Sequence, residues 1–243
     1  DTSIMQKIAL KLKGLNKSFG GLLAVNNVDM LVNESSISGL IGINGAGKTT
    51  LMNCISGIYR ADSGSLDIMG VSCLNWSPHD IARLGVGRTF QIPRIFKRIN
   101  LIDNVMVPAL NDNSDDKTLY ERATECLDKV KLYDLRHNNA EELSGGQQKL
   151  LELARIMMFN PKIILLDEPF AGVNPTLCRL MIERIKELKE QGKSFLLVSH
   201  DLTSIYQLSD HIYVLNQGQV ISEGNVDYVR NDPEVIEAYL GNA

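Results

Sequence analysis

The chain has 243 residues, of which 44% are hydrophobic and 22% are charged, the balance of a globular protein large enough for a well-buried core. Its net charge of −4 argues against a nucleic acid as the main partner, because phosphate binding needs a basic face. Charged residues keep the apolar stretches short, at the N-terminus and beyond, so we expect neither a signal peptide nor a membrane-spanning helix of roughly 18 apolar residues.

Strand-like and helix-like segments alternate along the chain, and this alternation predicts an α/β fold with a largely parallel sheet. The opening segment, Ile8–Val32, alternates in polarity without a helix signal and is expected to form antiparallel strands. Ile37–Ile41 is expected to be a strand that leads through a glycine turn into a helix over Lys48–Ser56.

The stretch from Ile92 to Asn160 has a different character. Helical periodicity runs through Leu119–Val130 and Lys149–Phe159, after a polar loop. We therefore predict a mostly helical subdomain over residues 92–160, inserted into an α/β core made of residues 1–91 and 161–243.

The last third of the chain returns to the α/β pattern. Ile163–Leu166 and Phe195–Val198 are compact apolar runs of the kind found in buried parallel strands, and Thr176–Glu190 between them has the spacing of a surface helix. Ser-Pro at 77–78 and Asp-Pro at 232–233 are start signals for two short helices, which are expected to end at Gly85 and Gly241.

The segment Gly42–Thr49 fits the pattern G-x-x-x-x-G-K-[ST] between an expected strand and an expected helix. Glycines let the backbone wrap tightly, so that its N–H groups and the helix N-terminus face bound phosphates. Lys48 can neutralise phosphate oxygens and the Thr49 hydroxyl can ligate Mg²⁺, whereas an ordinary glycine-rich turn would need neither. The residues that we assign to nucleotide binding here are Asn44, Gly45, Gly47, Lys48, Thr49 and Thr50.

An acidic pair, Asp167 and Glu168, ends the expected strand Ile163–Leu166. Strand ends are often acidic, so the pair alone is a weak signal. Beside a phosphate loop, however, the carboxyl edge of a parallel sheet is where ligands bind. We expect Asp167 to hold a magnesium ion and Glu168 to polarise an attacking water as a general base.

The run Leu143–Gln147 reads L-S-G-G-Q and precedes a helix that is expected to begin near Gln148. Ser144 is a natural N-cap, and the two glycines allow close backbone approach, which makes this a second helix terminus able to bind an anion. In isolation an ordinary helix start explains the run equally well. In a chain with a phosphate loop, about twenty residues before an acidic strand, the run resembles the signature of the ABC ATPase family.

The resemblance to ABC ATPases covers essentially the whole chain and implies a P-loop NTPase core with an antiparallel β subdomain and an inserted helical subdomain. It implies that Phe19 stacks on adenine, that Gln91 senses Mg²⁺ and the γ-phosphate, and that His200 contacts the γ-phosphate. The implied catalytic set is Glu168, His200 and Gln91, and the implied magnesium ligands are Thr49, Gln91 and Asp167. The family further implies a dimer that binds ATP between the phosphate loop of one subunit and the signature of the other, through Ser144, Gly145, Gly146 and Gln147.

Four segments are similar to the branched-chain (hydrophobic) amino acid importer branch, the LivG-type ATP-binding subunits: Asn16–Leu22, Val86–Gln91, Asp167–Pro175 and Val235–Gly241. That branch implies integral-membrane permease subunits, a second ATP-binding subunit and, indirectly, a periplasmic or extracellular solute-binding protein as partners. It implies a peripheral location on the cytoplasmic face of the inner (plasma) membrane. Similar strings occur in urea or amide importers and in the ATPase of lipopolysaccharide export, which remain alternatives.

Asn174 stands where the family usually has an aspartate. Competing functions are a soluble, non-transport ABC ATPase, a P-loop kinase and a nucleotide switch that does not hydrolyse ATP. The single cassette argues against the first, and the intact signature argues against the second. The presence of Glu168 and His200 argues against the third. Apolar Ile92, Ile95 and Phe96, next to Gln91, lead us to expect a docking surface for membrane partners there.

Overall fold

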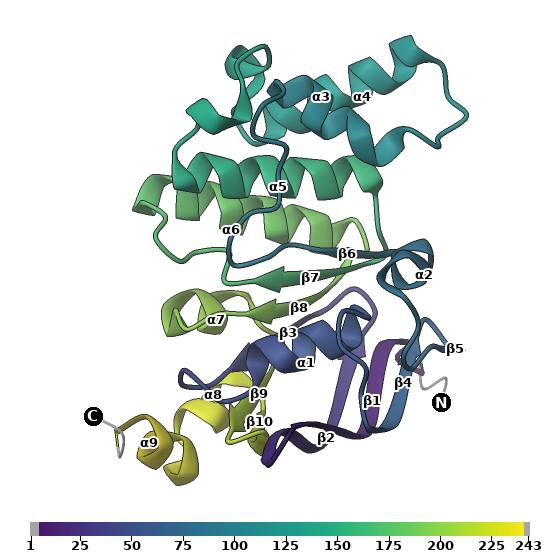
Figure 1. The fold of residues 1–243 in the computed structure, drawn as a ribbon. Helices are drawn as coiled ribbons and strands as arrows, with labels where there is room; N and C mark the ends of the chain where they lie inside the picture. Colours follow the sequence, from purple (N-terminus) through teal and green to yellow (C-terminus); the bar gives the residue numbers. More distant parts are fainter. Residues whose placement is uncertain (1–4, 241–243) are drawn as a thin grey trace.

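A six-stranded sheet forms the centre of the molecule, a computed structural model that describes residues 5–240 (Figure 1). Its strands lie in the order β10-β9-β3-β8-β7-β6. Neighbouring strands from β9 to β6 run parallel, and only β10 is antiparallel to its neighbour. The strands are β3 (Ile37–Ile41), β6 (Val86–Arg88), β7 (Ile163–Asp167), β8 (Ser194–Val198), β9 (His211–Asn216) and β10 (Gln219–Gly224).

Both faces of this sheet are buried, which explains why its central strands are apolar throughout. Because side chains alternate across a strand, Ile163 and Leu165 join one core cluster, while Ile164 and Leu166 join the other. The first cluster includes α1 (Lys48–Ile55) and the second includes α5, α6 and α7. These last three helices span Gly145–Phe159, Pro175–Glu190 and Leu202–Leu208.

A second, antiparallel sheet of order β2-β1-β4-β5 packs into the same core cluster as α1. Its long strands β1 (Ile8–Phe19) and β2 (Leu22–Asn33) confirm the antiparallel strands expected over Ile8–Val32. Its other two strands, β4 (Ser63–Ile68) and β5 (Val71–Ser72), were not predicted. In Figure 1 this sheet lies beside α1, away from α5 and α6.

The segment that we predicted as mostly helical contains α3 (Leu101–Met106), α4 (Asp116–Lys129) and α5. Helix α4 begins earlier than predicted because the Asp115 side chain accepts a hydrogen bond from the N–H of Thr118. The expected helix start near Gln148 was wrong, since α5 begins at Gly145. Short 3₁₀ turns complete the segment at Val107–Ala109, Tyr133–Leu135 and Ala140–Glu142.

The two short helices with proline start signals are present. Helix α2 (Pro78–Arg83) is capped by Ser77, whose Oγ accepts the N–H of Asp80. Helix α9 (Pro233–Leu240) follows α8 (Val226–Arg230), and its expected end at Gly241 lies outside the described residues. Among residues 5–240 no helix combines the length and the apolar character needed to cross a membrane.

Candidate functional site

Four neighbouring strands deliver the sequence-predicted residues to one edge of the sheet. β3 leads into the phosphate loop, β7 ends at Asp167, β8 is followed by His200, and β6 is followed closely by Gln91. At this edge lies a cleft of about 1230 Å³. Its lining includes the following predicted residues: Phe19, Asn44, Gly45, Gly47, Lys48, Thr49, Thr50, Gln91, Asp167, Glu168 and His200.

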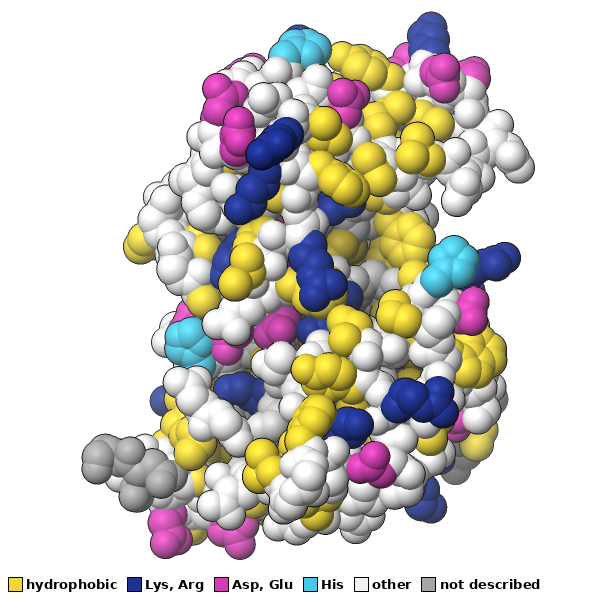
Figure 2. All heavy atoms as spheres, viewed as in Figure 1, with side chains coloured by type: hydrophobic (Ala, Val, Ile, Leu, Met, Phe, Trp, Pro, Cys, Tyr) yellow, Lys and Arg dark blue, Asp and Glu magenta, His cyan; other side chains and the backbone are white. Residues whose placement is uncertain are grey.

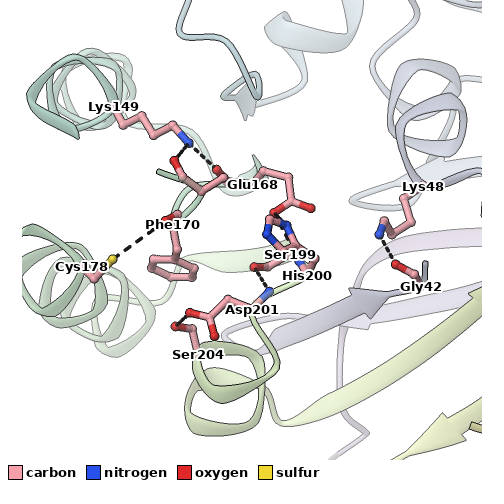
Figure 3. A network of polar contacts seen from close by, with 11 residues as sticks. Gly42, Lys48, Lys149, Glu168, Phe170, Cys178, Ser199, His200, Asp201 and Ser204 are labelled. Atoms are coloured by element: carbon pink, nitrogen blue, oxygen red, sulfur yellow. Dashed lines mark hydrogen bonds and ion pairs between the residues drawn. The ribbon is translucent and has the colours of Figure 1, made fainter. Parts of the chain in front are cut away.

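The phosphate loop has a backbone path that only glycine allows at one point. Gly47 has φ of 101°, and a Cβ added there would lie 2.4 Å from the carbonyl oxygen of Ala24. Helix α1 starts directly after it, and no side chain among residues 5–240 caps the helix N-terminus. The Lys48 ammonium bonds to the carbonyl of Gly42 (Figure 3), so the loop presents a helix terminus and a cation to the cleft.

Burial lowers the pKa of Lys48, and the carboxylates of Glu168 and Asp167 act in the opposite direction. Burial likewise raises the pKa of Asp167, and the Arg88 guanidinium opposes that effect. The cleft is therefore a place where charges of both signs are held out of water, close enough to influence one another.

Arg88 is a site residue that the sequence motifs did not single out. Its Nη2 lies 3.6 Å from Oδ2 of Asp167, and both side chains are buried. Its Nη1 donates to Oδ1 of Asn53 at 2.7 Å and to Oγ of Ser56 at 2.6 Å, both on or just after α1. Arg88 thus links the acidic strand end to the helix of the phosphate loop.

Glu168 directs its carboxylate toward His200. The Oε2 atom of Glu168 lies 2.8 Å from Nδ1 of His200 and accepts the His200 backbone N–H at 3.2 Å (Figure 3). The Glu168 backbone has φ of 49°, in the left-handed region that non-glycine residues seldom adopt. Its carbonyl accepts a hydrogen bond from the Lys149 ammonium at 2.7 Å.

The far end of the cleft is aromatic and apolar. Phe19 is 43% exposed and packs edge-on against Tyr59, with ring centroids 5.3 Å apart. Lys17 Nζ lies 5.0 Å from the centre of the Phe19 ring. The cleft is also lined by residues that we did not predict: Leu22, Leu23, Ala24, Gln217, Gly218 and Tyr239.

The four signature residues are not among those lining the cleft. Ser144 and Gln147 form a capping box at the start of α5: the Gln147 N–H donates to Ser144 Oγ, and the Ser144 N–H donates to Gln147 Oε1. Ser144 and Gly145 are exposed. Asn174 has a local task as the N-cap of α6, where its Oδ1 accepts the N–H of Leu177 at 3.0 Å.

A family model described as "ABC transporter" matches residues 25–171 of the chain. The chain belongs to the ABC transporter family. A second model, described as "Branched-chain amino acid ATP-binding cassette transporter", matches residues 219–243. Within the family the chain is an ATP-binding, ATP-hydrolysing cassette, as the resemblance implied.

Individual relatives agree with this assignment. The cassette is 43% identical to a probable branched-chain amino acid transport ATP-binding protein, LivG, of Archaeoglobus fulgidus, over 96% of this chain and 95% of that protein. Its fold matches the ADP conformation of MJ1267, an ATP-binding cassette of an ABC transporter, with a TM-score of 0.87 and 34% identity over 96% of this chain and 99% of that one. A dimeric bacterial ABC transporter cassette, MJ0796, matches with a TM-score of 0.83 and 25% identity over 89% and 98% of the two chains.

Proposed function

We propose that this cassette powers the import of branched-chain or other hydrophobic amino acids by hydrolysing ATP in the cleft at the carboxyl edge of the sheet. The observation that carries the proposal is the convergence of a phosphate loop, the Asp167–Glu168 pair and His200 at the ends of adjacent strands. In the proposed arrangement the adenine stacks on Phe19, and the phosphates bind between Lys48 and the N-terminus of α1. The residues that contact them are Asn44, Gly45, Gly47, Lys48, Thr49 and Thr50.

Magnesium is part of the proposal because the cleft holds the donors that it prefers. Thr49, Gln91 and Asp167 offer hydroxyl, amide and carboxylate oxygens to the same space. Within the described part of the chain, no group of three or more His, Cys, Asp or Glu side chains could hold a metal ion by itself. We therefore infer that these three residues hold Mg²⁺ jointly with phosphate oxygens, whose negative charge the ion neutralises.

Hydrolysis requires a group that takes a proton from the attacking water, and Glu168 is our candidate. Its carboxylate lies at the cleft and makes no ion pair with lysine or arginine in the described residues. His200 contacts that carboxylate through Nδ1, which leaves Nε2 available to the γ-phosphate. Gln91, which follows β6 at the same edge of the sheet, would contact the same phosphate.

The signature at the start of α5, of which Ser144 and Gly145 are exposed, supports a dimer. Since Ser144–Gln147 does not line the cleft of its own chain, we propose that it completes the cleft of a second ATP-binding subunit. The anion-binding character of a helix N-terminus suits that role. The related MJ0796 cassette is dimeric, which supports the same assembly here.

Membrane partners are proposed to dock on the connection between β6 and α3. Ile92 is 80% exposed and Phe96 is 49% exposed, and neither belongs to a helix or strand. Ile95, which we expected to share this surface, is half-buried and packs into the core instead. Nearby, a groove of about 230 Å³ runs between β6 and α5, and Figure 2 shows hydrophobic and basic side chains together in a hollow on this face.

The cargo and the location rest on the relatives. Because the A. fulgidus relative is named for branched-chain amino acid transport, we propose the same cargo, with permease subunits as direct partners and a solute-binding protein as an indirect one. A cassette of this kind would lie on the cytoplasmic face of the inner membrane. The chain is predicted to divide into a core (1–91 and 161–243) and a helical subdomain (92–160). Binding of ATP would then move the helical subdomain relative to the core.

The decisive experiment compares the wild-type chain with Glu168→Gln. The purified wild-type chain should release phosphate from ATP without any added acceptor, which a kinase would require. Glu168→Gln should bind ATP with unchanged affinity and turn over at least about 100-fold more slowly, because general-base catalysis contributes factors of that size. Near-normal turnover by the variant would falsify the assignment of Glu168, and absence of acceptor-free hydrolysis would overturn the proposed function.

A further inference from the structure

Lys149, a buried side chain of helix α5, contacts the turn after β7 that carries Glu168. The Lys149 ammonium donates to the carbonyl oxygens of Glu168 at 2.7 Å and of Ala171 at 2.8 Å (Figure 3). The hydrogen bond within this turn is weaker, since the distance from the Ala171 nitrogen to the Glu168 carbonyl oxygen is 3.4 Å. Lys149 therefore makes two short hydrogen bonds to the backbone of the turn that follows β7.

That turn contains a backbone conformation that needs support. Glu168 is in the left-handed region, which is unfavourable for a non-glycine residue and persists only where the surroundings enforce it. The same left-handed residue directs its carboxylate to His200. Since the side chain leaves the same Cα, any relaxation of φ at Glu168 would move the carboxylate relative to the cleft.

Lys149 is buried among carboxylates. Burial lowers the pKa of Lys149, and the carboxylates of Glu168, Glu152 and Asp167 act in the opposite direction. Lys149 does not line the cleft, and the hydrogen bonds of its ammonium go to main-chain carbonyls. Its role is therefore to hold the backbone in place.

Helix α5 also holds the other loop of the site. Three residues beyond Lys149, and thus on the same side of the helix, Glu152 accepts the N–H groups of Phe90 at 3.3 Å and of Arg94 at 2.9 Å. These two residues flank Gln91. One helix, whose N-terminus is the signature, thereby holds the backbone on both sides of the cleft.

We propose that Lys149 is a positioning residue for Glu168: it fixes the left-handed turn that carries the carboxylate and so ties the catalytic geometry to the position of α5. This inference rests on the proposed role of Glu168 as the general base. It gives the signature a second task within its own subunit. A displacement of the α5 N-terminus at Gly145, only four residues from Lys149, is transmitted to the base through two hydrogen bonds.

The test uses the purified chain with Lys149→Met, which keeps most of the length of the side chain and removes its donors. We expect kcat for ATP to fall roughly 10- to 100-fold, as small displacements of catalytic groups do, while KM stays within about twofold. Lys149→Arg, which still donates N–H groups to carbonyls, should recover most of the lost kcat. If Lys149→Met does not fold, Lys149→Gln takes its place, since it keeps a shorter donor.

A double-mutant cycle with Glu168→Gln separates positioning from mere stabilisation. Once the carboxylate is absent, Lys149→Met should lower the remaining single-turnover rate by less than about twofold. A full additional loss in the Glu168→Gln background, or a kcat of Lys149→Met within about twofold of wild type, would overturn the inference. Near-normal turnover by Glu168→Gln alone would instead overturn the proposed base.

A matched control addresses stability. Met158 is buried near the C-terminal end of the same helix, about 13 Å along its axis from Lys149. Met158→Ala should lower the temperature of unfolding without changing kcat at low temperature. If Met158→Ala lowered kcat as much as Lys149→Met at equal loss of stability, the effect of Lys149 would be general destabilisation and the inference would fail.

Discussion

The Nδ1 atom of His200 lies 2.8 Å from Oε2 of Glu168, although the two residues follow different strands of the sheet. β7 and β8 are adjacent and parallel, so their carboxyl ends deliver both side chains to one point. Because the Glu168 carboxylate can only accept, this hydrogen bond is donated by the Nδ1–H group of His200. The second ring nitrogen, Nε2, takes no part in this contact.

Replacing His200 with alanine should therefore disturb the base as well as remove a phosphate contact. We expect turnover to fall by roughly 100-fold, with ATP affinity nearly unchanged. The measurement is steady-state phosphate release together with equilibrium nucleotide binding. His200→Gln, which can still donate to Glu168, should retain more activity than His200→Ala, and equal activity of the two variants would contradict the role of this hydrogen bond.

The buried ion pair of Arg88 and Asp167 predicts a large loss of stability in Arg88→Met. Removing the guanidinium leaves the Asp167 carboxylate buried without its cation, a change that typically costs about 3–5 kcal/mol. The free energy of unfolding in urea measures it. The pair of Lys129 and Glu187, 3.2 Å apart and much more exposed than Arg88 and Asp167, provides the comparison: Lys129→Met should cost no more than about 1 kcal/mol. Similar losses in the two variants would show that burial of the first pair is energetically unimportant.

The central strands and the phosphate loop could be predicted because their signals are local. Ile163–Leu166 is a continuous apolar run, and Gly42–Thr49 has a fixed spacing. β9 could not be predicted in this way, since it begins at His211 and pairs in parallel with β3 (Ile37–Ile41), which lies far earlier in the sequence. Strand pairing at such separation depends on packing that no short window contains.

The same limit applied to the site. Arg88 belongs to one of the segments that carry the family resemblance, yet its partners Asp167, Asn53 and Ser56 come from two other segments. Tyr239 lines the cleft from α9, the last described helix, and only the folded chain brings it there. The error in the start of α5 was local by contrast: the capping box of Ser144 and Gln147 allows the helix to begin at Gly145, before its apolar periodicity.

If membrane partners dock on Ile92 and Phe96, changing these residues should abolish transport but not ATP hydrolysis. Ile92 and Phe96 are exposed, so Ile92→Ser with Phe96→Ser should leave folding and basal ATPase activity of the isolated chain within about twofold of wild type. In the complex with its permease subunits, the same variant should lose transport. The double variant is assayed for both activities in parallel.

Met5→Ser is the control for the docking experiment, because Met5 is 89% exposed and lies far along the chain from the connection after β6. It should keep both activities. Ile95 is unsuitable for this purpose, since it packs into the core and its replacement would also destabilise the fold. Retained transport in Ile92→Ser with Phe96→Ser would place the membrane partners elsewhere on the cassette.

The raised pKa of the buried Glu152 side chain should make the stability of the fold depend on pH. Burial raises its pKa from 4.5 to about 7, while the N–H groups of Arg94 and Phe90, and the charges of Arg155 and Lys149, act to lower it. Between those two pH values the folded chain retains a proton that the unfolded chain has released. The contribution of Glu152 to the free energy of unfolding is therefore largest below about pH 4.5, declines as the pH rises, and is lost above about pH 7.

The comparison with Glu152→Gln isolates this effect, because the amide does not titrate and the two proteins share every other ionisable group. Relative to the variant, the wild-type chain should lose roughly 3 kcal/mol of unfolding free energy between pH 4.5 and 7, because the pKa of Glu152 rises from 4.5 to about 7 on folding. Urea unfolding at intervals from pH 4.5 to 8 measures the difference. Parallel stability curves for the two proteins would mean that the folded chain holds Glu152 ionised throughout, with the N–H groups of Phe90 and Arg94 offsetting the cost of its burial.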